Sequence, residues 1–294
     1  MTVRASADVT ARGGRLRTRA SASRAGWLQV TPALAASLVL FVGPLVLLFA
    51  GSLRGDAGGY RRVFGDSYYL DTTITTLRVA GTATVITVAI GYLTAYCIVR
   101  VLRSSWARRL VLLLLVAPMF ISAVVRSFGW LALLGREGMV NDLARALGLT
   151  DDGFSLLYNE TSVVIGLVYI LVPYAALTIL PVFDAASGQL ERAAADLGAA
   201  PLRRFARVTL PLTLPGVYAG GLMVFALAFT SYVTPAVLSG GRVTVLSMLI
   251  YDQVLVTFDW ATAAALALVM LLLSTIAIAA YLRLQRSTRL QGVA

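Results

Sequence analysis

Long apolar runs alternate with short polar segments along the whole chain. Six of these runs reach about 20 residues or more, the length that an α-helix needs to cross a hydrocarbon core of about 30 Å. They cover residues 26–52, 72–102, 110–134, 162–183, 216–238 and 261–284. The third, fourth and fifth runs contain prolines, which a helix tolerates inside a bundle. The pattern predicts an all-α fold, a polytopic bundle of six transmembrane helices.

Composition supports the membrane class and restricts the chemistry. Apolar residues make up 59% of the 294 positions and charged residues 13%, and the mean hydropathy is +0.82. The sequence has no histidine, and all 25 basic residues are arginine. Neither a Cys/His metal site nor a lysine-containing phosphate loop is therefore available. We expect no catalytic residue, no metal, no cofactor and no ATP hydrolysis by this chain, and Cys97 is expected to be a packing residue.

The arginines are distributed unevenly between the two sets of connecting segments. With the N-terminus inside, 17 arginines lie on the inner side, six lie on the outer side, and Arg78 and Arg126 lie within runs. Because basic residues favour the cytoplasmic side, both termini are expected in the cytoplasm. The predicted division is a basic tail over 1–26, a transmembrane domain over 27–285 and a tail over 286–294. The net charge of +11 thus indicates topology and contact with the lipid bilayer, with no nucleic-acid partner.

Arg78 and Arg126 have two interpretations. Each lies near enough to the outer end of its run for the side chain to snorkel to the interface. Alternatively, each guanidinium pairs with an acidic residue of an outer loop.

The inner segment over 184–215 has the strongest local pattern. Apolar and small residues at helical spacing predict a short first helix, which Gly198 ends in the left-handed conformation. Pro201 suits the first turn of a second short helix, and Leu210-Pro211 is expected to stop it. A basic amphipathic loop resting on lipid headgroups would explain the arginines. The small residues favour close approach of another protein.

This segment resembles the EAA loop of binding-protein-dependent ABC importer permeases, in which Glu-Ala-Ala-x-x-x-Gly is followed further along by Leu-Pro. The matching positions are Ala193, Ala194, Gly198, Leu210 and Pro211. The motif's glutamate falls on Arg192, and Glu191 stands one position earlier. Further segments resemble the spermidine/putrescine permease branch. They cover 60–80, 124–149, 231–241 and 248–260.

The resemblance implies a type I ABC importer permease-like fold in the bacterial inner (plasma) membrane. It implies three kinds of protein partner: a dimer of cytoplasmic ABC ATPases, a second permease subunit that forms a heterodimer with this one, and an external solute-binding protein. It also implies that the loop couples the permease to the ATPases. The residues expected to do so are Glu191, Arg192, Ala193, Ala194, Asp196, Gly198, Leu210 and Pro211.

The imported solute is expected to be a polyamine such as spermidine or putrescine. A polycation is recognised by carboxylates and aromatic faces. Candidates for the pathway are Trp130, Phe229, Tyr232, Tyr251, Asp252, Asp259 and Trp260. The alternative interpretation of these aromatic residues is an interfacial belt.

The residues alone are compatible with two other functions. One is import of a different small solute, since no acidic residue falls clearly in the middle of a run. The other is a secondary carrier, although the usual mid-membrane carboxylate or histidine for ion coupling is missing.

The arginine distribution generates a test of orientation. A reporter fused after Ala294 should be active only if it works in the cytoplasm. A reporter inserted near Asp151 should be active only if it works in the periplasm. The measurement is activity of paired reporters at both sites, and reversal at either site would overturn the predicted topology.

Overall fold

The computed structural model describes residues 18–53, 58–102, 104–185 and 188–291, and the regular structure in these ranges is helical. In chain order the elements are α1 (Thr18–Ser52), α2 (Gly58–Gly65), α3 (Ser67–Tyr96), the π turn η1 (Cys97–Val101), α4 (Ser105–Val116), the 3-10 turn η2 (Ala117–Phe120), α5 (Ala123–Leu134), α6 (Met139–Ala146), α7 (Glu160–Ala185), α8 (Gly188–Asp196), α9 (Pro201–Arg204), the π turn η3 (Phe205–Thr209), α10 (Leu210–Phe229), α11 (Val233–Leu238), α12 (Leu246–Leu255) and α13 (Trp260–Gln291).

Within the described residues, five helical segments are long and apolar enough to cross a membrane. They are Thr31–Ser52, Ser67–Val101, Glu160–Ala185, Pro201–Phe229 and Trp260–Arg283. The third predicted run is a bent pair, Ser105–Phe120 and Ala123–Ala146, with an angle of 101° between its parts. Counting this pair as one span gives the six expected crossings. The all-α membrane bundle is confirmed, and the third span, predicted over 110–134, is bent.

Pro118 explains the break in the third span. A proline lacks the N–H donor of a regular helix, and its ring clashes with the preceding turn. The chain therefore passes through η2 and becomes extended at Ile121. Ser122 then begins α5, because its hydroxyl accepts a hydrogen bond from the Val124 N–H at 3.3 Å.

The fifth span also differs from its prediction. Leu210-Pro211 does not stop a helix, because α9, η3 and α10 form one continuous helical segment from Pro201 to Phe229. The Leu210 N–H bonds to the Phe205 carbonyl, five residues back, so the helix is widened just before the proline. This wider turn lets the helix continue past Pro211, which has no N–H to donate. The predicted run over 216–238 instead ends at Phe229, and Pro235 belongs to the separate helix α11.

The two ends of the chain are more helical than expected. α1 begins at Thr18, inside the predicted tail over 1–26, and α13 continues to Gln291, inside the predicted tail over 286–294. Alanine, leucine and arginine at these positions are good helix formers, so the helices extend beyond the apolar runs. The rest of the two predicted tails, 1–17 and 292–294, lies outside the described residues.

Small residues allow α3, α7 and α10 to approach one another closely. A Cβ atom on Gly91 of α3 would lie 2.6 Å from the Cβ of Ala175 on α7. A Cβ atom on Gly216 of α10 would lie 2.8 Å from a methyl group of Val182 on α7. Helices in a membrane associate through such van der Waals contacts between small residues. These three helices therefore form the centre of the bundle.

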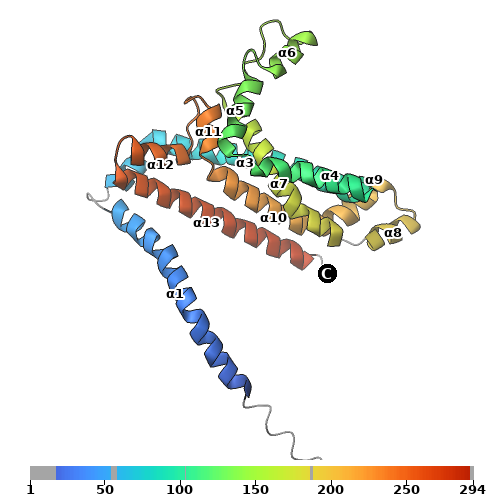
Figure 1. Cartoon of the computed structure of the whole chain (residues 1–294), viewed down its shortest axis with the longest axis horizontal. Coiled ribbons are helices and arrows are strands. Elements are labelled where there is room, and N and C mark those ends of the chain that lie inside the picture. Colours follow the sequence, from blue (N-terminus) through green and yellow to red (C-terminus); the bar gives the residue numbers. More distant parts are fainter. Residues whose placement is uncertain (1–17, 54–57, 103, 186–187, 292–294) are drawn as a thin grey trace, which may run out of the picture.

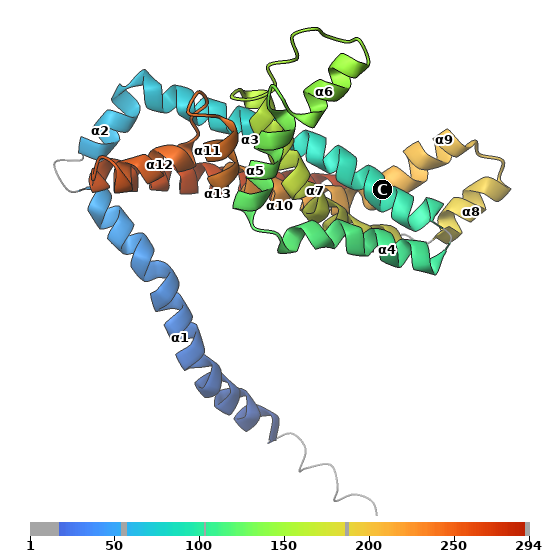
Figure 2. The same cartoon turned by 45° about the horizontal axis from the view of Figure 1, so that its top comes forward.

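The bundle has two distinct ends. α8, α9 and the start of α4 lie at one end, here called the loop end, while α2 and α12 lie at the opposite end, here called the far end (Figure 1, Figure 2). α1 leaves the bundle near the far end and makes its main contacts with α13 (Figure 1). α6 projects from the bundle beyond α5 (Figure 2).

Candidate functional site

The elbow between α8 and α9 is formed as its glycine predicts. Gly198 has a φ of +76°, in the left-handed region that only glycine enters without steric cost. The Gly198 N–H bonds to the Ala195 carbonyl at 2.9 Å, and the Ala199 N–H bonds to the Ala194 carbonyl at 3.0 Å. This pair of bonds ends α8 as a Schellman motif.

The tip of the elbow presents apolar side chains to its surroundings. Leu197 is 88% exposed and Leu202 is 80% exposed, on either side of Gly198. A Cβ atom on Gly198 would meet no atom within 4 Å. Ala193 and Asp196 are also exposed, and Ala194 is half-buried. The tip is therefore a surface available to another protein.

Glu191 points away from this surface, into the bundle. Its Oε1 accepts a hydrogen bond from Arg100 Nη2 at 2.9 Å and another from the Thr209 hydroxyl at 2.6 Å. Arg192, which occupies the position of the motif's glutamate, is exposed, and its Nε donates to the Gly188 carbonyl at 3.1 Å. One residue along a helix rotates a side chain by about 100°, and this rotation separates the two environments.

The residues predicted to couple the loop to the ATPases therefore lie in different parts of the structure. The exposed residues 192, 193 and 196–198 lie on the outer part of the loop, Ala194 is half-buried, and Glu191 lies beneath the loop. Leu210 and Pro211 belong to the first turn of α10. A hollow of about 1060 Å³ lies between the loop and the helix ends, lined by Tyr96, Arg100, Glu191, Arg192, Pro201, Arg204, Phe205 and Thr209.

Sequence reasoning missed Arg100 and Thr209 as partners of the loop. Arg100 is one of the 17 arginines counted on the inner side, and no sequence motif singles out Thr209. Arg100 lies 91 residues from Glu191, so no local spacing indicates their contact. Thr209 lies 18 residues from Glu191. The sequence predicts a helix end at Pro211, so it does not indicate that the segment of Thr209 continues into α10.

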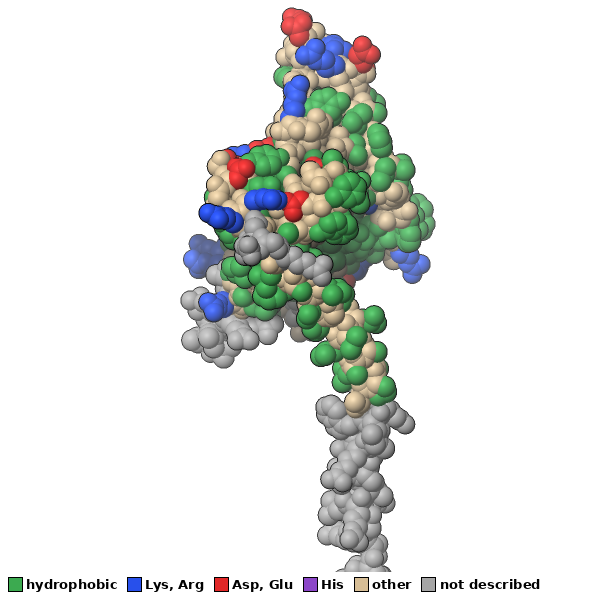
Figure 3. All heavy atoms as spheres, turned by 90° about the vertical axis from the view of Figure 1, so that its left-hand side faces the viewer, with side chains coloured by type: hydrophobic (Ala, Val, Ile, Leu, Met, Phe, Trp, Pro, Cys, Tyr) green, Lys and Arg blue, Asp and Glu red, His purple; other side chains and the backbone are tan. Residues whose placement is uncertain are grey.

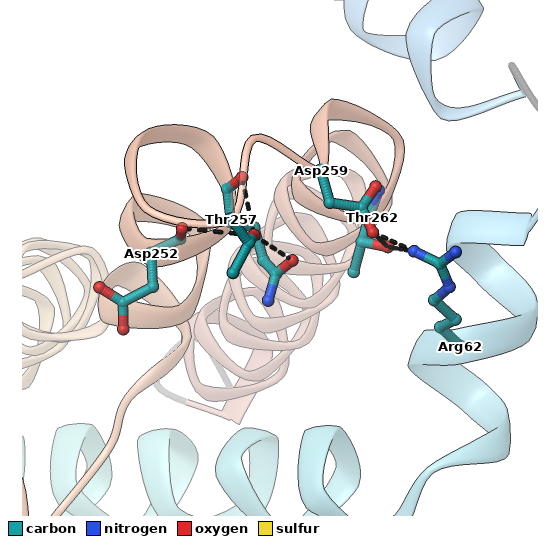
Figure 4. A network of polar contacts seen from close by, with 6 residues as sticks. Arg62, Asp252, Thr257, Asp259 and Thr262 are labelled. Atoms are coloured by element: carbon teal, nitrogen blue, oxygen red, sulfur yellow. Dashed lines mark hydrogen bonds and ion pairs between the residues drawn. The ribbon is translucent and has the colours of Figure 1, made fainter.

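At the far end, three of the pathway candidates come together. The rings of Tyr232 and Tyr251 stack with centroids 4.6 Å apart and planes 25° apart. Asp252 follows Tyr251 on α12, is exposed, and directs its carboxylate away from the neighbouring polar network (Figure 4). Burial, followed by the neighbouring Tyr251 and Asp252, raises the pKa of Tyr232, so its phenol stays neutral. The arrangement is an aromatic pair beside an accessible carboxylate.

Asp259 has a structural position instead. Its Oδ1 accepts a hydrogen bond from the Thr262 N–H at 3.1 Å at the start of α13, and its Oδ2 accepts one from the Thr262 hydroxyl at 2.8 Å. The same carboxylate pairs with Arg62 of α2 (Figure 4). Burial raises the pKa of Asp259, but the bonds from Thr262 and the charge of Arg62 outweigh it and lower the pKa overall. Asp259 thus joins α2 to α13.

The remaining aromatic candidates are dispersed. Trp130 contacts Tyr169 edge to face, with centroids 5.4 Å apart, beside an apolar hollow between α3, α4, α5 and α7. Trp260 lines a different hollow, between α1, α12 and α13. Phe229 is only 1% exposed and stacks on Phe225 in the core, where a solute does not reach it in this structure.

The arginines within the runs also differ from each other. Arg78 pairs with Glu160 at the start of α7, which is the second of its two predicted interpretations. Nε and Nη1 of Arg126 have no hydrogen-bond partner among the described residues. Charged side chains of both signs lie on the face turned to the far end and on the projecting segment above it (Figure 3).

The sequence profile of a family described as the binding-protein-dependent transport system inner membrane component matches residues 87–290, more than half of the chain. The chain belongs to this family. The permease is 31% identical to the spermidine/putrescine transport system permease protein PotB of Haemophilus influenzae over 215 residues, 73% of this chain and 74% of that protein. It is 29% identical to PotB of Escherichia coli over 260 residues, 85% of this chain and 94% of that protein.

Solved structures support the fold of the permease. A bacterial ABC transporter that imports the polysaccharide alginate superimposes with a TM-score of 0.76, at 17% identity and with 94% of this chain and 98% of that chain covered. The bacterial alginate transporter in complex with its pentasaccharide-bound periplasmic protein gives a TM-score of 0.74 at 18% identity, over 91% and 95% of the two chains. The expected ABC importer permease fold is confirmed.

Family membership decides the broad role of the permease. It is a multi-pass protein of the inner membrane and a transport component of a binding-protein-dependent ABC importer. Its family comprises permease subunits and not catalysts. The secondary-carrier alternative is thereby removed.

The position of Asp259 generates a stability prediction. Asp259→Ala should lower the free energy of unfolding by about 1–2 kcal/mol, mostly through the lost helix cap, since the exposed Arg62 pair contributes less than about 1 kcal/mol. Because folding lowers the pKa of Asp259, its contribution is complete above the ordinary pKa of 3.8 and is lost as the pH falls through the lowered value.

Thermal unfolding of the purified protein in detergent at several pH values measures this effect. Asp252→Ala is the matched control, since its carboxylate takes no part in the Arg62–Asp259 network. An equal loss of stability in both variants would contradict the assignment of Asp259 as the cap.

Proposed function

We infer that this permease imports a polyamine as one subunit of an ABC importer. The observation that carries the proposal is the likeness to PotB, a spermidine/putrescine permease, over 85% of this chain and 94% of that protein. The geometry at the far end supports it. A stacked tyrosine pair beside an exposed carboxylate offers a polycation both a charge and aromatic faces.

The loop end is proposed to face the cytoplasm, with both termini on the same side. The excess of arginine on the segments at this end supports the orientation. The far end then faces the periplasm and the solute-binding protein. A cation released there would meet Asp252 and the tyrosine pair first.

A cytoplasmic ATPase dimer is the proposed partner of the elbow. Leu197 and Leu202 are large apolar side chains exposed at the end of a polar loop, where water would otherwise cover them. Gly198 between them leaves open space, so a partner's surface can approach the backbone. Arg192 on the exposed side favours a partner that carries an acidic group nearby.

A second permease subunit is the proposed neighbour of α1. Residues 31–50 of α1 are almost entirely exposed, and the helix separates from the bundle along most of its length (Figure 1). A partner permease beside α1 would fill this space and complete a pathway between the two subunits. In the polyamine branch that the sequence resembles, the two permeases differ.

Import of another small solute is the second candidate. The molybdenum transport system permease protein ModB of Mycobacterium bovis is 31% identical over 196 residues, 66% of this chain. Arg126, whose Nε and Nη1 have no hydrogen-bond partner among the described residues, is a group that an anion would contact favourably.

Gly198→Glu tests the coupling role of the elbow. Glutamate at this φ costs about 1 kcal/mol of backbone strain, and its side chain occupies the space left for the partner. The variant should insert in the membrane at a normal level and abolish uptake. Co-purification of the ATPase and the initial uptake rate are the measurements.

Two controls accompany this substitution. Gly198→Ala carries the same strain with little bulk and should retain most uptake. Arg203→Ala, in the same loop, should be mild. Wild-type uptake by Gly198→Glu at normal expression would refute the docking role.

Asp252→Asn tests the substrate. Removing the negative charge should raise the KM for a polyamine roughly fivefold, the size expected for one exposed charge–cation contact. Binding of the solute to the external protein should not change. Uptake kinetics in membrane vesicles measure the effect, with Asp142→Asn as the control, because Asp142 is paired with Arg145 at 3.1 Å. Unchanged kinetics in Asp252→Asn would remove this residue from the pathway.

A further inference from the structure

We propose that Glu191 acts as an internal clamp, meaning a side chain that bonds the segment over 184–215, here called the coupling loop, to both α3 and α10. Movement of the coupling loop is thereby transmitted to the two helices together. The proposal rests on the proposed docking of the loop to an ATPase. In it, the exposed tip of the loop binds the partner, and Glu191 binds the body of the permease. Glu191 is thus a positioning residue that does not itself touch the ATPase.

The contacts of one oxygen atom carry the proposal. Oε1 of Glu191 accepts from Arg100 Nη2 at 2.9 Å and from the Thr209 hydroxyl at 2.6 Å. Arg100 belongs to the end of the span that begins with α3, and Thr209 belongs to the segment that continues into α10. A single carboxylate on α8 is therefore bonded to both helices.

The environment strengthens these bonds. The Glu191 side chain is 23% exposed and the Arg100 side chain is 21% exposed, so water screens their attraction only in part. Among the described residues that line the hollow, Glu191 is the acidic one, and Arg100, Arg192 and Arg204 contribute positive charge. A charge-assisted bond in such surroundings is stronger than a neutral one.

Both contact points of Glu191 lie in π turns. Arg100 is in η1 and Thr209 is in η3. π turns are uncommon and concentrate at functional positions, because the wider ring lets a helix change its register or direction locally. A pull on either residue is thus applied where the helix is most easily deformed.

The movement would pass directly to the core. α3 and α10 both pack closely on α7, through Gly91 and Gly216, and they also contact each other. Close-packed helices transmit a displacement to their neighbours. Displacing α8 therefore displaces the ends of α3 and α10 as a pair. The one-residue offset of Glu191 from the motif's glutamate is what turns its carboxylate inward.

The test uses the complete transporter, with the ATPase, partner permease and loaded binding protein, in proteoliposomes. Glu191→Gln should keep the ATPase bound. The stimulation of ATP hydrolysis by the loaded binding protein and the initial uptake rate should both fall roughly tenfold, as expected for losing one charge-assisted bond. Thr209→Val should reduce both quantities while leaving the Arg100 pair intact.

A double-mutant cycle tests whether the Glu191–Arg100 pair carries movement of the loop to α3. The loss in Arg100→Gln combined with Glu191→Gln should be smaller than the product of the two single losses, whereas independent losses would multiply. Arg108→Gln is the matched control, because Arg108 pairs with Asp184 at 2.6 Å at the same end and neither residue belongs to a π turn. It should keep the wild-type coupling of hydrolysis to uptake.

Several results would overturn the clamp. Loss of the ATPase from Glu191→Gln would make Glu191 a docking residue, and unchanged stimulation and uptake would make it dispensable. If both Glu191→Gln and Thr209→Val fail to accumulate in the membrane, their contacts serve folding and the clamp is refuted. Failure of the docking itself is distinguishable, because Gly198→Glu would then retain both the ATPase and uptake.

Discussion

Close contact between α3, α7 and α10 is the constraint on which the rest of the bundle depends. Lipid tails are as apolar as the side chains of these helices, so exclusion from water does not hold them together in the membrane. Glycines such as Gly91 and Gly216 allow the backbones to touch neighbouring side chains instead. A larger residue there would separate the helices. It would also shift the positions of Arg100 and Thr209 at the loop end.

Carboxylates at the two ends of the bundle have different tasks. Glu191 and Asp259 each join helices that are far apart in the sequence, and each accepts hydrogen bonds and takes part in an ion pair. Asp252 lies only seven positions before Asp259 but points away from this network. Asp252 therefore keeps the accessible carboxylate that the proposed cation pathway requires.

The spans, and the elbow at Gly198, were predictable because their causes are local. An apolar run of membrane length forms a helix whatever its neighbours are, and a glycine after a short helix favours the left-handed conformation. The bend at Pro118 and the continuity across Pro211 were not predictable. Both prolines disrupt a regular helix, but only the backbone around each one decides between a break and a widened turn.

The candidate site residues show the same difference between features with a local cause and features that depend on the assembled fold. The sequence groups Tyr232 and Tyr251 with Phe229 as aromatic candidates for the pathway. In the structure Phe229 faces the core, because it is the last residue of α10, whereas Tyr232, three residues later, lies beyond the end of that helix. The partnership of Glu191 with Arg100 joins segments 91 residues apart. Contacts of this kind depend on the assembled bundle, which the spacing of residues within one segment does not describe.

The main contacts of α1 have a consequence for biosynthesis. α1 is synthesised before the other described helices, and its principal contact is with α13, the last of them in the chain. During synthesis α1 must therefore remain in the bilayer without this contact until α13 has been inserted. Its apolar composition over Thr31–Ser52 favours this, because a helix satisfies most of its backbone groups internally and only a proline such as Pro44 leaves a carbonyl without its usual partner.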